Sequence, residues 1–208
     1  MGQTAPRMSE VLPELSVPRL AATERLVARA PFHLTDARTG DAPRLATAVR
    51  VGLRGAELCV RFDGRDDGVV ASLTERDAPL WQEDVFEVFL SPEDPPCLYY
   101  EFEVNPLGTL FDARVSSPDL ERATMRVETA WDCAGFSARV TRAPGRWSAS
   151  LRIPLAPLCG GPPPQTWRAN FYRIDRGAVD EYSAWAPTLS QPPDFHVPRR
   201  FGTLRLPL

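Results

Sequence analysis

The fold of this 208-residue chain is decided by LWQEDVFEVFL (residues 80–90), SPEDPPC (91–97) and LYYEFEVNPLGTLFDA (98–113), which follow one another without a break. The first and third segments alternate between apolar and polar residues and are rich in β-branched and aromatic side chains. Period-two alternation of this kind is typical of β-strands. The proline-rich middle segment is typical of a turn. The stretch therefore predicts two or three consecutive antiparallel strands.

Alternation assigns the side chains of this stretch to two faces. One face is apolar and predicts a core, whereas the other gathers carboxylates, an amide and, at its start, Trp81. Carboxylates on one face of a hairpin repel each other, so an arginine, a metal ion or the hydroxyl groups of a ligand must compensate them. The first face holds Phe86, Val88, Leu90, Tyr100, Phe102 and Val104, and the second holds Val85, Glu87, Phe89, Tyr99, Glu101, Glu103 and Asn105.

The rest of the chain carries the same signal in short segments with turns between them and almost no helical periodicity. About ten short strands in a chain of this length predict an all-β fold, a single antiparallel β-sandwich of the immunoglobulin-like or jelly-roll-like type. Residues 1–25 are expected to be an N-terminal arm, extended or poorly ordered, and residues 26–208 to be the domain. Further strands are expected at residues 47–53, 57–63, 69–76, 109–115, 125–131, 136–142, 147–153, 167–175, 182–185 and 201–206, and the segments 125–131 and 136–142 are expected to pair as a hairpin.

The amino-acid composition limits the classes of partner that the protein is expected to bind. The net charge is −3, which argues against nucleic acid, and no apolar run predicts a membrane span. Every basic residue that is not histidine is an arginine, a donor suited to carboxylates. The four cysteines lie far apart and are expected to be free thiols in a reducing compartment. With no apolar segment near the N-terminus, a cytoplasmic location is expected.

The order of the segments resembles a known family. WQEDVFEVFL and YYEFEVNPLG are followed by TRAPGRWSASLRIPLAPL, WRANFYRID and SAWAPTLSQPPDFHVPRRFGTLRL. This series resembles the family 9 carbohydrate-binding modules and the wider DOMON-like β-sandwich group, from about Leu45 to the C-terminus. The resemblance implies non-catalytic binding of a carbohydrate ligand, a terminal mono- or disaccharide unit, in carbohydrate catabolism.

The resemblance also implies a site. In family 9 modules two tryptophans sandwich one terminal sugar, and Trp81, six residues before Glu87, matches the first by its spacing. Trp185 is the match for the second. Glu87 and Asn105 match residues that contact hydroxyls. Glu103 stands where better-known sugar binders carry arginine, which replaces a donor with an acceptor. Arg114 is a further candidate for contact with the sugar.

Structural roles compete with these binding roles. Trp81 and Trp185 could fill the rim of the sandwich, as the strand tryptophans Trp131, Trp147 and Trp167 are expected to fill its core. Glu87 could be a buried carboxylate paired with Arg173 or Arg114, and loss of one partner of such a pair is costly. The alternative function is therefore a structural or protein-interaction β-sandwich that has lost the sugar site.

Two further hypotheses concern carboxylates. The acidic loop DGRDDG offers Asp63, Asp66 and Asp67 as ligands for a structural calcium ion, which family 9 modules carry, although a solvated turn is the simpler interpretation. Glu87 and Glu101 could be cross-strand neighbours about 5 Å apart, close to the separation in retaining glycosidases. These two carboxylates project from a sheet and not across a cleft, so glycoside hydrolysis is the lowest-ranked alternative, and we expect no enzyme activity.

Overall fold

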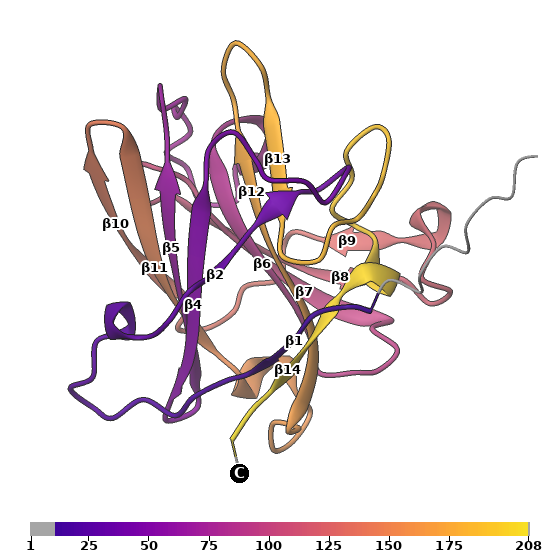
Figure 1. Ribbon diagram of the computed structural model, residues 1–208. Helices are drawn as coiled ribbons and strands as arrows, with labels where there is room; N and C mark the ends of the chain where they lie inside the picture. The colour runs from indigo at the N-terminus through magenta and orange to yellow at the C-terminus, as the bar shows by residue number, and fades with distance from the viewer. Residues whose placement is uncertain (1–10, 208) are drawn as a thin grey trace, which may run out of the picture.

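Two β-sheets pack face to face in the computed structural model, which describes residues 11–207 (Figure 1). The larger sheet has the order β1-β14-β12-β6-β7-β8-β9, with β13 and β3 attached beside β12, and the smaller has the order β10-β11-β5-β4-β2. The all-β sandwich expected from the sequence is confirmed. The strands are β1 (Glu14–Ser16), β2 (Phe32–His33), β3 (Thr35–Asp36), β4 (Thr47–Arg54), β5 (Glu57–Arg65), β6 (Val85–Ser91), β7 (Leu98–Val104), β8 (Leu110–Ser116), β9 (Arg126–Glu128), β10 (Ser137–Ala143), β11 (Arg146–Pro154), β12 (Thr166–Asp175), β13 (Glu181–Ala184) and β14 (Gly202–Arg205).

The helical content of residues 11–207 consists of single 3-10 turns. No helix in this range is long and apolar enough to cross a membrane. Strand pairing is antiparallel throughout the two sheets except between β1 and β14, which run parallel. The 3-10 turns are Leu26–Ala28, Leu80–Gln82, Arg122–Thr124, Ala156–Leu158 and Pro198–Arg200.

The main core lies between the two sheets and is built on the apolar face of the central hairpin, β6 and β7. Phe86 of β6 is stacked between two rings of the smaller sheet, with centroid distances of 4.7 Å to Phe62 and 3.8 Å to Trp147. Trp147 and Trp167 are fully buried here, whereas Trp131 is only partly buried at the margin. Burial of such aromatic side chains supplies much of the stability of a sandwich.

A second core covers the outer face of the larger sheet, which sequence alternation assigned to polar groups. Val85, Phe89 and Tyr99 on that face are buried against Phe111 and Phe201. Both faces of β6 and β7 are therefore covered by the protein, and the carboxylates between these apolar residues are buried as well.

Two expectations about strands are wrong. Residues 69–76 form no strand, because side chains take the place of strand partners: Asp84 accepts the N–H of Val70, and Glu83 accepts the N–H of Ser72. The expected hairpin of residues 125–131 and 136–142 is also absent, since β9 pairs with β8 and β10 pairs with β11. Alternation identifies a strand but not its partner.

The expected N-terminal arm lies partly outside the described residues, which begin at residue 11. Within the described part, β1 pairs with β14, and Val17 and Leu20 are buried. This part is extended, and it is ordered against the sandwich. The four cysteines are free thiols.

Candidate functional site

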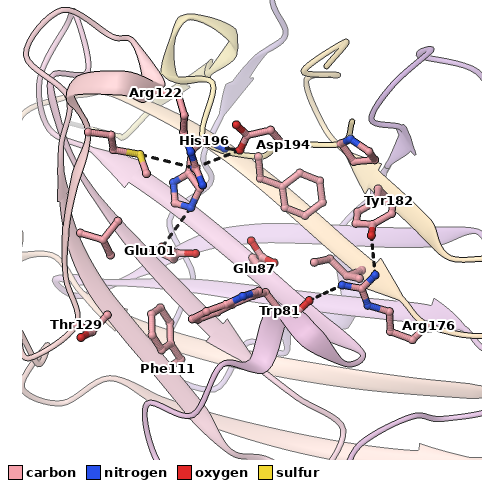
Figure 2. A pocket seen from close by; sticks show the side chains of 15 residues that line it. Trp81, Glu87, Glu101, Phe111, Arg122, Thr129, Arg176, Tyr182, Asp194 and His196 are labelled. Carbon is pink, nitrogen blue, oxygen red and sulfur yellow. Dashed lines mark hydrogen bonds and ion pairs between the residues drawn. The ribbon is translucent and has the colours of Figure 1, made fainter. Parts of the chain in front are cut away.

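A pocket of about 450 Å³ opens on the outer face of the larger sheet (Figure 2). Its floor is formed by Glu87 of β6 and Glu101 of β7. We call it the outer pocket. Its walls come from four places in the chain: the turn at Trp81, the start of β8, the segment between β8 and β10, and the segments on either side of β13. Pockets of this size with apolar walls and a few polar groups are typical of small-ligand sites. The remaining lining residues are Trp81, Phe111, Arg122, Met125, Val127, Thr129, Ile174, Arg176, Tyr182, Pro193, Asp194, Phe195 and His196.

Trp81 lies at the rim of the outer pocket and is 41% exposed. It belongs to the 3-10 turn Leu80–Gln82, which buried Leu80 anchors in the outer core. The indole packs edge-on against the Phe111 ring, with 5.3 Å between the ring centroids. The backbone oxygen of Trp81 accepts a hydrogen bond of 2.7 Å from Arg176 Nη2. The indole is therefore held in place while part of it stays open to solvent.

One side of the pocket is an arginine–tyrosine pair. Arg176 follows the end of β12, and its Nη1 donates to the hydroxyl of Tyr182 and to Asp180, both at 2.6 Å. The guanidinium also lies over the Tyr182 ring, 5.3 Å from its centroid, a favourable cation–π contact. These contacts hold Arg176 and Tyr182 in place as one wall of the pocket.

The facing wall is the loop that contains Asp194, Phe195 and His196. His196 Nδ1 lies 2.8 Å from the Tyr99 hydroxyl, and its Nε2 lies 3.9 Å from Glu101 Oε2 (Figure 2). Burial lowers the pKa of His196, although Glu101 opposes this, so the neutral imidazole is favoured. Arg122 reaches Asp194 at 3.3 Å and ties the loop to the segment after β8.

The floor contains three buried carboxylates. Glu87 and Glu101 are 2% and 5% exposed, and Glu103 behind them is completely buried. One oxygen from each lies within 4.8 Å of one from each of the others. Burial and the neighbouring Glu101 raise the pKa of Glu87, and burial together with Glu87 and Glu101 raises the pKa of Glu103. No hydrogen-bond partner reaches either oxygen of Glu103.

The two arginines considered as partners of Glu87 point elsewhere. Arg173 sits opposite Phe86 in the β12–β6 register and shares its face, while Glu87 faces the other way, opposite Tyr172. Arg114 lies on the face of Tyr100 and donates to Glu128 at 2.6 Å. The structure thus corrects the interpretation of Glu87 as half of an arginine pair, and it also places Arg114 outside the pocket.

Asn105 is buried beneath the turn that joins β7 and β8. Its Oδ1 accepts the N–H groups of Leu107 and Thr109, and its Nδ2 donates to the Leu73 carbonyl at 2.8 Å. Both the oxygen and the nitrogen of the Asn105 amide are therefore hydrogen-bonded within the protein. The expected contact between Asn105 and a sugar hydroxyl is not supported by this position, because the amide does not line the outer pocket.

Trp185 does not face Trp81. It follows β13 and packs against the inter-sheet core, with its ring 5.4 Å from Phe32 and 5.5 Å from Phe171. Trp81 lies on the outer side of the larger sheet. The expected sandwich of one sugar between two tryptophans is therefore corrected, because the sheet itself separates the two indoles.

The three calcium candidates do not converge. Asp63 bonds Arg50 and Arg61, and Asp67 is exposed beside Arg44. Asp66 instead lies near Asp84 and Asp175 around Arg173. The DGRDDG loop thus uses its carboxylates in ion pairs, which is a correction of the proposed ligand set.

The suggestion that Glu87 and Glu101 are directly opposite each other on neighbouring strands is also corrected. Glu87 lies directly opposite Glu103, and Glu101 lies opposite Phe89. Alternation placed all three carboxylates on one face, yet it could not reveal the register, which depends on how the 91–97 turn is built.

The sequence did not predict most of the residues that form the walls of the outer pocket. It did not identify His196, Phe111, Tyr182 or Arg176 as lining residues. Of the predicted site residues, Trp81 and Glu87 line the outer pocket, Glu103 lies directly behind it, and Asn105, Arg114 and Trp185 lie elsewhere. No local pattern marks the missed residues, because they are brought together only by loops that cover the sheet.

The model of carbohydrate-binding family 9 matches residues 42–206 of this chain. The chain belongs to this family. Among curated proteins, this family 9 chain is 28% identical over 142 residues to a protein of Arthroderma benhamiae described as an extracellular protein. That alignment covers 61% of this chain and 62% of the relative, so the chain spans about three fifths of that relative's length.

Solved structures share the fold of this family 9 chain. A candidate carbohydrate-binding protein from Bacteroides uniformis superposes with a TM-score of 0.73 at 21% identity, covering 93% of this chain and 99% of the other. A family 9 module from Caldicellulosiruptor kristjanssonii, solved in complex with glucose, gives a TM-score of 0.64 at 12% identity, covering 94% and 96%. The same type of module in complex with cellotriose gives 0.65 at 11% identity, covering 93% of each.

Proposed function

We propose that the outer pocket binds a carbohydrate without cleaving it, and that the bound part is a terminal mono- or disaccharide unit. Membership of carbohydrate-binding family 9 supports the ligand class. The single observation that carries the proposal is Trp81, an indole fixed on Phe111 yet 41% exposed, standing above two buried carboxylates. Sugars present flat CH faces ringed by hydroxyls, and this pairing of an aromatic surface with acceptors suits both features.

The chemistry follows from the lining. Trp81 would cover the CH face of a sugar ring, and Glu87 and Glu101 would accept hydrogen bonds from its hydroxyls. A carboxyl group accepts hydrogen bonds in either protonation state and can also donate one when it is protonated, and the apolar walls exclude competing water. Trp185 and Asn105 take no part, so recognition would differ from a two-tryptophan clamp.

The second candidate function is a protein-interaction domain without a sugar site. The observation that favours it is the internal use of Trp185 and Asn105, two residues that the family resemblance assigned to the ligand. The two candidates are separated by direct binding measurements with sugars.

We expect Trp81→Ala to abolish or strongly weaken carbohydrate binding. Stacking of a base on an aromatic ring is worth about 1–3 kcal/mol, and a comparable sugar contact corresponds to a loss of roughly tenfold or more in affinity. A glycan array followed by calorimetry on the best ligand measures this loss. Trp131→Ala is the matched control, because Trp131 packs on Tyr100 away from the outer pocket. Sugar binding that Trp81→Ala leaves intact would refute the site, and no binding to any glycan would favour the interaction domain.

A further inference from the structure

Three clusters of acidic side chains occur within residues 11–207, and two of them contain an arginine that forms ion pairs with their carboxylates. In the first, Arg173 contacts Asp66 and Asp175 beside Asp84. In the second, Arg76 contacts Asp77, Asp112 and Asp132. The protein itself therefore supplies a cationic partner to each of these two clusters.

The third cluster, Glu87, Glu101 and Glu103, has no arginine within ion-pair distance among the described residues. His196 Nε2 lies 3.9 Å from Glu101, and Arg176, which lines the same pocket, is bonded to Asp180 and Tyr182. Three carboxylates with oxygens within 4.8 Å of one another therefore face each other with no arginine between them. Isolated buried charges of this kind are strongly unfavourable.

Glu103 points independently to a missing ligand. Its side chain is completely buried, and neither of its oxygens has a hydrogen-bond partner. It lies directly opposite Glu87 on the neighbouring strand, so its carboxylate is aimed at the other two and not at solvent. Most buried polar side-chain atoms have at least one hydrogen-bond partner, whereas the Glu103 oxygens have no such partner and their close neighbour is the carboxylate of Glu101.

We propose that Glu87, Glu101 and Glu103 bind a divalent metal cation at the floor of the outer pocket. This goes beyond carbohydrate binding: the metal would occupy Glu87 and Glu101, the carboxylates that the proposed function assigns to sugar hydroxyls, and would present its own open coordination positions to those hydroxyls. Metal binding is tested without any sugar. Ca²⁺ binds carboxylate oxygens at 2.3–2.6 Å, and one oxygen of each side chain lies within 4.8 Å of one oxygen of each of the others, so a single ion between them can reach all three. The open side of the pocket would supply water as the remaining ligands.

The wall beside the floor adds a possible nitrogen ligand. The contact between His196 Nδ1 and the Tyr99 hydroxyl, 2.8 Å, fixes the ring with Nε2 toward Glu101. Such a contact on the second ring nitrogen is the usual way in which metal-binding histidines are oriented. Ca²⁺ prefers oxygen ligands, whereas Mn²⁺ also accepts imidazole, so the two metals distinguish an all-carboxylate site from one that includes His196.

The test is calorimetric titration of the chelator-treated full chain with CaCl₂ and, separately, with MnCl₂. We expect one saturable site per chain, and Glu103→Gln should lower its affinity at least tenfold. His196→Gln should weaken Mn²⁺ binding and leave Ca²⁺ binding unchanged if the imidazole is a ligand. Asp132→Asn, a change in a cluster already held by Arg76, is the matched control and should bind as the wild type does.

The thermal unfolding temperature, measured with and without metal, provides a second test that does not require calorimetry. In chelator at pH 8, Glu103→Gln should unfold at a higher temperature than the wild type, because the uncharged amide can donate hydrogen bonds to the neighbouring carboxylates. Added metal should raise the unfolding temperature of the wild type more than that of the variant. The proposal is wrong if neither metal binds or stabilises the wild type at pH 8, in which case shared protons neutralise the cluster. It is equally wrong if Glu103→Gln binds the metal as tightly as the wild type does.

Discussion

At the scale of single residues, the outer pocket depends on which polar side chains the protein satisfies internally. Asn105 has three hydrogen-bond partners within the protein, while Glu103 has none. Both are completely buried, and both lie on the same face of the central hairpin. The difference separates them: Asn105 builds the β7–β8 turn, whereas Glu103 is the carboxylate for which we propose a metal ligand.

Asn105→Ala should therefore lower stability and not remove a ligand contact. The substitution removes three hydrogen bonds: the N–H groups of Leu107 and Thr109 lose their acceptor, whereas the Leu73 carbonyl keeps its hydrogen bond from Thr109 Oγ1. With about 0.5–1.5 kcal/mol per hydrogen bond, we expect a loss of roughly 2–4 kcal/mol in the free energy of unfolding, measured by urea denaturation. Gln82→Ala, an exposed position nearby, is the control. A variant as stable as the wild type would contradict this role.

At the scale of elements, Trp185 explains how the edge of the larger sheet is closed. Its ring lies over Gly202 of β14, at the place where the N-terminal segment also approaches. A Cβ atom at Gly202 would lie 2.5 Å from Trp185 Cζ3 and 2.6 Å from the carbonyl oxygen of Pro13. The glycine thus lets β1, β14 and the indole pack together, which is why Trp185 packs against the core and is only partly exposed.

Gly202→Ala should be destabilising, because neither the indole nor the Pro13 backbone can move away cheaply. Overpacking of this kind typically costs about 1–3 kcal/mol, measurable as a lower midpoint of urea unfolding. Gly68→Ala is the matched control, since a Cβ there meets nothing within 4 Å. Equal stability of the two variants would show that β1 and Trp185 pack less tightly than described.

At the scale of the whole molecule, a buried arginine links the two sheets. Arg173 of β12 donates to Thr47 Oγ1 at 3.1 Å and to the Leu45 carbonyl at 3.4 Å, both at the start of the smaller sheet. It also pairs with Asp175 and Asp66. Burial raises the pKa of Asp175 to about 7, with Asp84 and Asp66 adding to the rise and Arg173 opposing it.

This pKa predicts how stability depends on pH. An unfolded aspartate titrates near 3.8, so between about pH 4 and 7 the folded state holds a proton that the unfolded state has lost. The contribution of Asp175 to stability therefore falls as the pH rises through this window. From pH 5 to pH 8 we expect the wild type to lose roughly 1–4 kcal/mol more than Asp175→Asn does.

Urea unfolding of both proteins at pH 5 and pH 8, in chelator, measures this difference. For each protein, the change in the free energy of unfolding between pH 5 and pH 8 is calculated, and the two changes are compared. The cost of altering the Arg173 contact is the same at both pH values and drops out of this comparison. The titration of groups elsewhere is the same in both proteins and also cancels. Parallel pH profiles for the two proteins would show that Asp175 is ionised in the folded state throughout the range.

The sequence by itself determined the all-β class, most of the strands and the face on which each side chain of the central hairpin lies, because alternation is a local property of an extended backbone. It placed Trp81, Glu87, Glu101 and Glu103 on one side. The tertiary structure alone decided the rest. Strand register set Glu87 against Glu103, and distant loops brought His196 and Tyr182 over the sheet. Contacts with Phe32, Phe171 and Gly202 placed Trp185 against the core. Such contacts join residues far apart in the chain, and nothing in the local pattern of either partner encodes them.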